Sequence, residues 1–264
     1  MSSLRRLVVF GDSYVQGYRA DPNPRIVNFN FPYYLADELG TGVINLGHRG
    51  HSNLAIANDV VSFIRRTPKD ELKNYAFLIC FSDWLRETAR NPNVKDADAH
   101  HALHGIVWSR WPQVKDPDEA TLRITTEMCY LGLKQLCQEL DIPYRMINSF
   151  DHQNFCDTLD IWVPKRYDDG RVEDVRLGSK TWKMQGPSGD PNWIESGSSY
   201  NTLFDIILGH WLMDDAKLAP TLYLKTHKLR KYDRQYMAGC GHPNIAGNKL
   251  IAQTLAPYLE PIIG

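Results

Sequence analysis

Leu7-Val8-Val9-Phe10-Gly11-Asp12-Ser13-Tyr14 is the stretch of sequence from which the fold can be worked out. Its run of β-branched and aromatic residues ends abruptly in Gly-Asp-Ser, which is typical of a buried strand followed by a turn. Because Gly11 has no Cβ, we expect the backbone to turn sharply there and to present the Ser13 hydroxyl at the carboxyl end of the strand. The alternative is a surface turn whose serine merely caps the next helix.

Length and charge limit what the chain can be. The 264 residues fit a single domain, 1–264, with an elaboration at about 151–240, and they are enough to bury a full core. With 30 Lys and Arg against 31 Asp and Glu, the formal net charge is -1. This balance favours neither a nucleic acid nor an anionic membrane as a partner, and it leaves the oligomeric state open.

The cysteines and the N-terminus predict a cellular location. The 5 cysteines are widely spaced and include no CxxC pair, so we expect free thiols in a reducing compartment. Residues 1–6 are too few and too charged for a secretory signal, and no run approaches the roughly 18 apolar residues of a membrane-spanning helix. These features predict a cytoplasmic protein, unless it leaves the cell within a larger assembly such as a virion.

Short apolar runs alternate with amphipathic runs along the first 150 residues. The predicted strands are residues 7–10, 42–46, 75–81 and 144–150. The predicted helices between them are residues 31–40, 54–66 and 120–140, the first with Pro32 in its first turn and the second capped by Ser52 or Asn53. This alternation indicates a parallel sheet with helices on both faces, whose strand-end loops gather at one edge.

Residues 151–240 break this rhythm with glycines, prolines and the tryptophans Trp162, Trp182, Trp193 and Trp211. We predict an elaboration on the sheet, part loop and part helix, with 201–213 as its best helical piece. Its aromatic side chains could line a substrate cleft, but packing onto the core is the more common role of tryptophan. A terminal helix is predicted from about residue 244 to 259, and Pro243 marks its beginning.

Four positions at the predicted sheet edge carry the chemistry. They are Ser13 after the first strand, Gly50 after the second, Ser82 after the third and His242 before the terminal helix. At one crevice they would supply a nucleophile, a backbone N–H donor, a hydroxyl donor and a base. Acyl transfer through a tetrahedral oxyanion requires this set of groups.

Three blocks of sequence resemble the SGNH (GDSL-type) hydrolases in chain order. Phe10-Gly11-Asp12-Ser13 resembles the first block, whose serine is the nucleophile and also donates its own N–H to the oxyanion. The second block is similar to residues 45–52, and its glycine, here Gly50, supplies another N–H. Gly241-His242-Pro243-Asn244 resembles the last block, whose histidine is the general base. The resemblance implies a flavodoxin-like three-layer α/β/α fold with a central parallel sheet and an insertion before the C-terminal helix, and an esterase without metal or cofactor.

The chain departs from the family pattern at two working positions. The third block is normally Gly-x-Asn-Asp, with the asparagine amide as an oxyanion donor, but this chain has Cys80-Phe81-Ser82-Asp83. In the last block, Gly239 stands where the family has the aspartate that orients the histidine. We expect a backbone carbonyl or water to orient His242 instead. The alternative is a carboxylate from elsewhere, with Asp214, Asp215 and Asp233 the nearest upstream.

The resemblance implies two-step hydrolysis of an ester, such as an O-acetyl group on a carbohydrate, through an acyl-enzyme on Ser13. Asp12 and Asp83 are interpreted as structural residues that cap or brace their turns, and not as members of a triad. The alternative is a catalytically weak or inactive SGNH-fold module with a binding or structural role, for example in a viral particle. Residues 81–84, Phe-Ser-Asp-Trp, resemble this block in phage-encoded members of the family, which is analogy only. The presence of both Ser13 and His242 favours the enzyme.

Two further clusters have simpler explanations. His100, His101 and His104 include an i, i+4 pair, but no further ligand cluster accompanies them, so a solvated helix face is favoured over a metal site. The basic and aromatic run at 223–236 could bind an anionic or sugar substrate at the cleft rim. An exposed amphipathic helix is favoured there because the chain has no basic excess.

Overall fold

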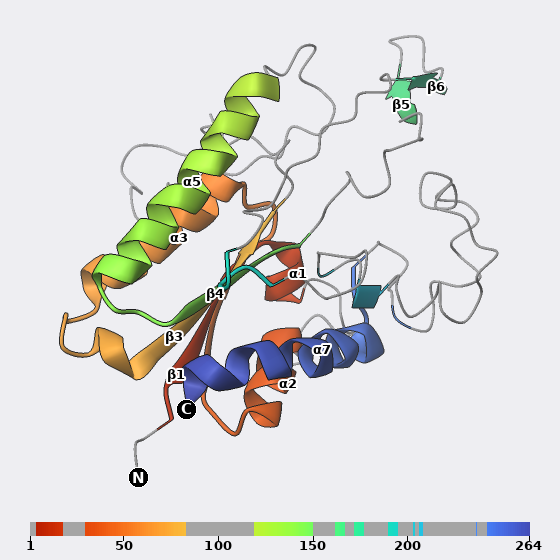
Figure 1. Ribbon diagram of the computed structural model, residues 1–264. Coiled ribbons are helices and arrows are strands. Elements are labelled where there is room, and N and C mark those ends of the chain that lie inside the picture. Colours follow the sequence, from red (N-terminus) through yellow and green to blue (C-terminus); the bar gives the residue numbers. More distant parts are fainter. Residues whose placement is uncertain are drawn as a thin grey trace, which may run out of the picture.

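A central parallel sheet organises the molecule. The computed structural model describes residues 4–17, 30–82, 119–149, 162–166, 172–176, 190–194, 203, 206–207, 236 and 242–264. Its 4-stranded sheet has the order β2-β1-β3-β4 (Figure 1). The strands are β1 (Arg6–Gly11), β2 (Val43–Gly47), β3 (Tyr75–Phe81) and β4 (Tyr144–Asn148). All neighbouring pairs are parallel, which confirms the predicted fold class and its strands.

The described helices are α1 (Ser13–Gln16), α2 (Phe31–Glu38), α3 (Asn53–Arg66), α5 (Glu119–Glu139) and α7 (Ile245–Ile263), with a short 3₁₀ helix η1 (Leu72–Asn74) before β3. Helices α2, α3 and α5 lie close to their predicted bounds and α7 begins where expected, but α1 and η1 were not predicted. Ser52 caps α3, its Oγ accepting the N–H of Ala55 at 3.3 Å. Helix α7 runs past the predicted end and through Pro257 and Pro261, because Leu259, Ile262 and Ile263 on its last turns are buried.

Helices cover both faces of the sheet. Successive side chains of a strand point to opposite faces, so Leu7 and Val9 of β1 belong to one core and Val8 and Phe10 to the other. The first core also contains residues of α1, α2 and α7, and the second contains residues of α3 and α5. Figure 1 shows α3 and α5 on one side of the sheet and α2 and α7 on the other. The architecture is the expected α/β/α sandwich.

The strand order places a crevice beside β1. Since β1 lies between β2 and β3, the chain leaves β1 to one side and then crosses over to the other. In open parallel sheets, ligand sites lie outside the carboxyl ends of the strands at such a reversal. Asp12 and Ser13 directly follow the carboxyl end of β1, which ends at Gly11.

A small antiparallel pair, β5 (Trp162–Arg166) and β6 (Val172–Arg176), lies within the elaboration. We predicted loop and helix for this region, and these two strands were missed. Valines at 163, 172 and 175 carry the β signal, but Pro164 interrupts the first strand and most of the other residues are charged.

Residues 190–194 return the elaboration to the sheet. Trp193 forms a parallel bridge with Met146 of β4, and its ring stacks on Phe81 with centroids 6.0 Å apart. The interpretation of tryptophan as a packing residue is therefore confirmed for Trp193. Trp182, Trp211 and most of the predicted helix 201–213 lie outside the described residues, although Leu203, Ile206 and Ile207 are helical and buried.

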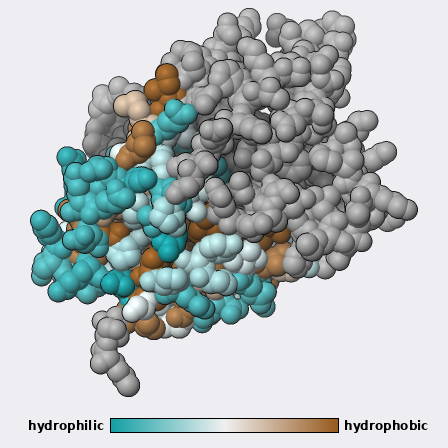
Figure 2. All heavy atoms as spheres, viewed as in Figure 1, coloured by the Kyte–Doolittle hydropathy of each residue, from teal (hydrophilic) through white to brown (hydrophobic). Residues whose placement is uncertain are grey.

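Polar side chains predominate over much of the described face in Figure 2, with apolar atoms between them. Of the helices in the described ranges, none combines the length and apolar character needed to cross a bilayer. The described cysteines Cys80, Cys129 and Cys137 are free and buried.

Candidate active site

The structure brings Ser13 and His242 together, although 229 positions separate them in sequence. The distance between Ser13 Oγ and His242 Nε2 is 2.9 Å. Ser13 is the first residue of α1, and His242 lies just before α7. Ser13 is 3 % exposed, while His242 is half-buried. A serine hydroxyl within hydrogen-bond reach of an imidazole nitrogen is the geometry required of a nucleophile and its base.

Asp12 sets the direction of the turn that carries Ser13. It is the N-cap of α1, and its Oδ1 accepts the backbone N–H of Tyr14 at 3.0 Å. This confirms the interpretation of Asp12 as a capping residue. Gly11 is not among the described glycines with a positive φ. A Cβ at Gly11 would clash with Val15 Cγ2 and lie 3.1 Å from the Cys80 carbonyl oxygen, so the turn needs a residue without a Cβ because α1 and β3 approach closely there.

Asn248 holds the turn that carries His242, and sequence reasoning missed it. Its Nδ2 donates to the carbonyls of Pro243 at 3.0 Å and Asn244 at 2.9 Å. Its Oδ1 accepts the N–H of Phe31 at 2.8 Å, which ties the turn to the start of α2. Asn248 is fully buried. An asparagine inside a helix is unusual because its side chain competes for backbone hydrogen bonds. Its place within the predicted terminal helix was therefore the sequence signal that could have singled out Asn248.

The Tyr14 ring lies beside the imidazole of His242, with ring centroids 5.6 Å apart. The groups considered for orienting that imidazole, namely Asp214, Asp215, Asp233 and the position of Gly239, lie outside the described residues. The expectation of a carbonyl or water in place of a carboxylate therefore stays a prediction.

Gly50 occupies a tight turn beside α1. The N–H of His51 donates to the carbonyl of His48 at 3.2 Å, and Gly50, the third residue of this turn, has φ 81°. Glycine is the residue that adopts this conformation most readily. The N–H groups of His48 and Arg49 donate to Gly11 O and to Gln16 Oε1, both at 3.0 Å. These contacts hold the Gly50 loop against the nucleophile turn.

Ser82 meets Asp12 at this edge of the sheet. Its hydroxyl donates to Asp12 Oδ2 at 2.8 Å, and its backbone N–H donates to Asn53 Oδ1 at 2.7 Å. This geometry departs from the expected oxyanion donor, because a hydroxyl has a single proton and here that proton is directed to a carboxylate. Asp83 lies outside the described residues.

Asn53 and Thr126 extend this contact; sequence reasoning considered Asn53 only as a helix cap and missed Thr126. Asn53 Nδ2 donates to Thr126 Oγ1 at 3.1 Å, which links α3 to α5. Cys80 also lies close to Asp12, and burial raises the pKa of its thiol well above the usual value, with a further increase from the Asp12 charge. Cys80 is therefore a protonated core residue and not a competing nucleophile.

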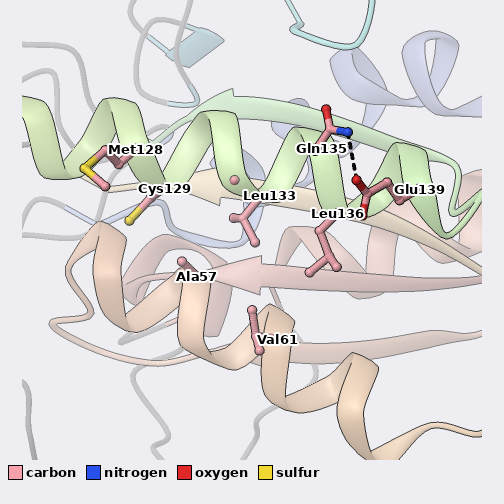
Figure 3. Close-up of a pocket in the computed structure, with 9 residues that line it drawn as sticks. Ala57, Val61, Met128, Cys129, Leu133, Gln135, Leu136 and Glu139 are labelled. Carbon is pink, nitrogen blue, oxygen red and sulfur yellow. Dashed lines mark hydrogen bonds between the residues drawn. The ribbon is translucent and has the colours of Figure 1, made fainter.

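A cavity of about 410 Å³ lies elsewhere, between α3 and α5. Figure 3 shows Cys129, Leu133 and Leu136 reaching from α5 toward Ala57 and Val61 of α3, with Met128 beside Cys129 on α5. Its lining is mainly apolar and includes neither Ser13 nor His242. Within the described residues no group of three or more His, Cys, Asp or Glu could hold a metal ion, and His100, His101 and His104 lie outside them.

Comparisons with known proteins find low similarity to solved structures. No family model and no curated protein matches the chain. Among solved structures it is similar to a member of the lipolytic protein G-D-S-L family from Veillonella parvula, with 12% identity, a TM-score of 0.40 and coverage of 96% of this chain and 97% of that one. It is also similar to the acetyl xylan esterase AlAXEase, with 14% identity, a TM-score of 0.35 and coverage of 95% and 97%. At these values the similarity supports no argument about the fold or the site.

Proposed function

We propose that this chain is a serine esterase in which Ser13 is the nucleophile and His242 the general base. The observation that carries the proposal is the 2.9 Å contact between Ser13 Oγ and His242 Nε2 at the carboxyl end of β1. Two further features support it. The contact lies where open parallel sheets bind ligands, and the sequence blocks around both residues resemble those of SGNH hydrolases.

In the first step, Ser13 Oγ attacks the acyl carbon of the ester while its proton passes to His242 Nε2. The new C–O bond leaves a tetrahedral oxyanion, for which the backbone N–H groups of Ser13 and Gly50 are the proposed donors. Ser13 suits this role because the first N–H groups of a helix have no partner within the helix. Preorganised donors of this kind are among the largest contributions to catalysis.

Collapse of the tetrahedral species breaks the ester C–O bond, and the alcohol leaves with the proton held on His242. The acyl group is then bound to Ser13 Oγ. Water attacks this acyl-enzyme, giving its proton to His242 Nε2, and the carboxylic acid leaves as the proton returns to Ser13. His242 thus acts as base and acid in turn. As the substrate class we propose esters of short acyl groups, with O-acetyl esters of carbohydrates as the first candidates.

Ser13→Ala tests the proposal directly. The native protein should hydrolyse short-chain p-nitrophenyl esters and be labelled by a fluorophosphonate probe, whereas Ser13→Ala should lose labelling and at least about 10³-fold in kcat. Ser149→Ala is the matched control, since Ser149 is a fully buried serine just beyond β4 of the same sheet, and it should behave like the native protein. Undiminished turnover in Ser13→Ala would refute the proposal. Absence of both hydrolysis and labelling in the native protein would favour an inactive binding or structural module.

A further inference from the structure

We infer that Ser82 is a positioning residue that acts on the nucleophile through Asp12, and not a donor to the oxyanion. The inference rests on the proposed function, because it concerns how Ser13 is held for attack. It assigns a role to Ser82, which stands where the SGNH pattern has the longer asparagine.

A chain of hydrogen bonds carries the inference. Asp12 Oδ1 accepts the N–H of Tyr14 at 3.0 Å, and Asp12 Oδ2 accepts the Ser82 hydroxyl at 2.8 Å. Ser82 is held in turn, because its own N–H donates to Asn53 Oδ1 at 2.7 Å. Asn53 is held by Thr126 at 3.1 Å. The four side chains linked by these hydrogen bonds are buried, with exposed fractions of 0% for Asp12, 2% for Ser82 and Asn53 and 4% for Thr126.

The two oxygens of Asp12 have different tasks. Oδ1 fixes the first turn of α1, which carries Ser13, and Oδ2 is fixed by Ser82. With both oxygens engaged, the carboxylate cannot rotate without breaking a charge-assisted hydrogen bond. The Ser82 hydroxyl therefore stabilises the orientation of the whole nucleophile turn. Without this hydroxyl, the Asp12 carboxylate can rotate away from the Tyr14 N–H. The first turn of α1 then loses its N-terminal cap and can shift.

Catalysis is sensitive to such a shift. Ser13 Oγ must stay 2.9 Å from His242 Nε2 for proton transfer, and His242 is fixed independently through Asn248. A displacement of about 1 Å between reacting groups can cost about a hundredfold in rate. The register of β1 against β3, which pairs Phe10 with Ile79, brings Ser82 beside Asp12 at the sheet edge. The short serine side chain ends at that carboxylate.

A double-mutant cycle separates the two roles of Ser82. We would measure kcat and KM for p-nitrophenyl ester hydrolysis in the native protein, Ser82→Ala, Asp12→Ala and the double variant. Ser82→Ala should lower kcat by about tenfold to a hundredfold and leave KM within about twofold, since Ser82 does not contact substrate. In the Asp12→Ala background, the same change should alter kcat less than about twofold, because the group through which it acts is gone.

An oxyanion donor would behave differently. Its removal would cost the same factor in kcat in both backgrounds, and this result would overturn the inference. If Asp12→Ala does not fold, Asp12→Ser replaces it, since a serine is also a good helix N-cap but has no second oxygen to accept the Ser82 proton. Equal costs of Ser82→Ala in the native and Asp12→Ser backgrounds would again overturn it.

A second measurement does not depend on activity. The Tyr14 amide should exchange its hydrogen about fivefold to tenfold faster in Ser82→Ala than in the native protein, because its acceptor is loosened. Ser149→Ala, which also removes a buried hydroxyl, should leave that exchange rate unchanged. Unchanged exchange in Ser82→Ala overturns the inference even if the ester is hydrolysed. Faster exchange without any ester hydrolysis supports the contact while refuting the proposed function.

Discussion

Asp12 and Asp190 are two buried aspartates with different surroundings. At Asp12 the two carboxylate oxygens accept from a backbone N–H, that of Tyr14, and from the hydroxyl of Ser82. At Asp190 the Lys134 ammonium lies 2.8 Å from Oδ2, the Tyr130 hydroxyl donates to the same oxygen, and the side chain is 3% exposed. The Asp12 carboxylate thus accepts these two neutral donors at the nucleophile turn, whereas the Asp190 carboxylate forms an ion pair with Lys134 of α5.

The surroundings of Asp190 indicate a role in stability. Its Oδ1 accepts the N–H of Asn192 at 2.9 Å, which orders the segment that pairs with β4. Asn192 in turn accepts from Arg145 Nη1 at 2.8 Å through its side chain and from the N–H of Met146 at 2.9 Å through its carbonyl. Asp190 therefore holds residues 190–194 against the sheet. A buried carboxylate can thus serve catalytic geometry or fold stability, depending on which groups its partners hold in place.

The largest expected difference between the two aspartates is in kcat. Asp12→Ala should lower kcat for ester hydrolysis by about a hundredfold through misplacement of Ser13, while loss of the helix cap costs only about 1 kcal/mol of stability. Asp190→Ala, measured on the folded fraction, should leave kcat within about twofold. Equal losses of kcat in the two variants, or a loss confined to Asp190→Ala, would contradict the assignment of Asp12 to catalytic geometry and of Asp190 to fold stability.

The next effect is on the free energy of unfolding and its dependence on pH. Burial raises the pKa of Asp190, but the hydrogen bonds from Lys134, Tyr130 and the Asn192 N–H outweigh it and leave the pKa below its ordinary value of 3.8. The unfolded chain then binds the proton more readily than the folded one. The Asp190 contribution is therefore complete above pH 3.8 and is lost as the pH falls through the folded-state pKa.

Urea unfolding of the native protein and Asp190→Asn at several pH values measures the contribution of the Asp190 charge to the free energy of unfolding. At pH 7 the variant should be less stable by about 2 kcal/mol, the scale for losing hydrogen bonds to a charged group. The difference should shrink as the pH falls below the ordinary aspartate range. Asp70→Ala, at an exposed aspartate, should stay within about 0.5 kcal/mol of the native protein. A difference that does not change with pH would show that the Asp190 charge is not what stabilises the fold.

The smallest effect belongs to Tyr130→Phe. Burial raises the pKa of the Tyr130 phenol, and the hydrogen bond to Asp190 and its charge raise it further, so the hydroxyl remains a donor at neutral pH. Its removal should cost about 1 kcal/mol in the free energy of unfolding, without effect on kcat, because the Lys134 contact to the same oxygen remains. Thermal or urea unfolding would detect it. A larger loss than in Asp190→Asn would place the stabilising interaction at Tyr130 and not at the carboxylate.

Much of the fold followed from local patterns in the sequence. Strands β1 to β4 were predicted from apolar runs that end in small polar residues, and the parallel pairing confirms them. Asp12 as a cap was predicted as well, because a cap bonds only two residues along the chain. The strands β5 and β6 were missed because Pro164 and charged residues obscure their pattern.

The sequence pattern predicts which residues arrive at the carboxyl edge of the sheet, because alternating strands and helices bring all strand ends to one side. Which of those residues touch one another depends on how the strands and helices pack in three dimensions. Ser13 meets His242 across 229 positions, Asn248 meets Phe31 across 217, and the Ser82 hydroxyl turns to Asp12 across 70. The physical reason is that a hydrogen bond depends on tenths of an ångström and on direction. Strand register and helix packing set both of these, and neither can be read from the spacing of residues along the chain.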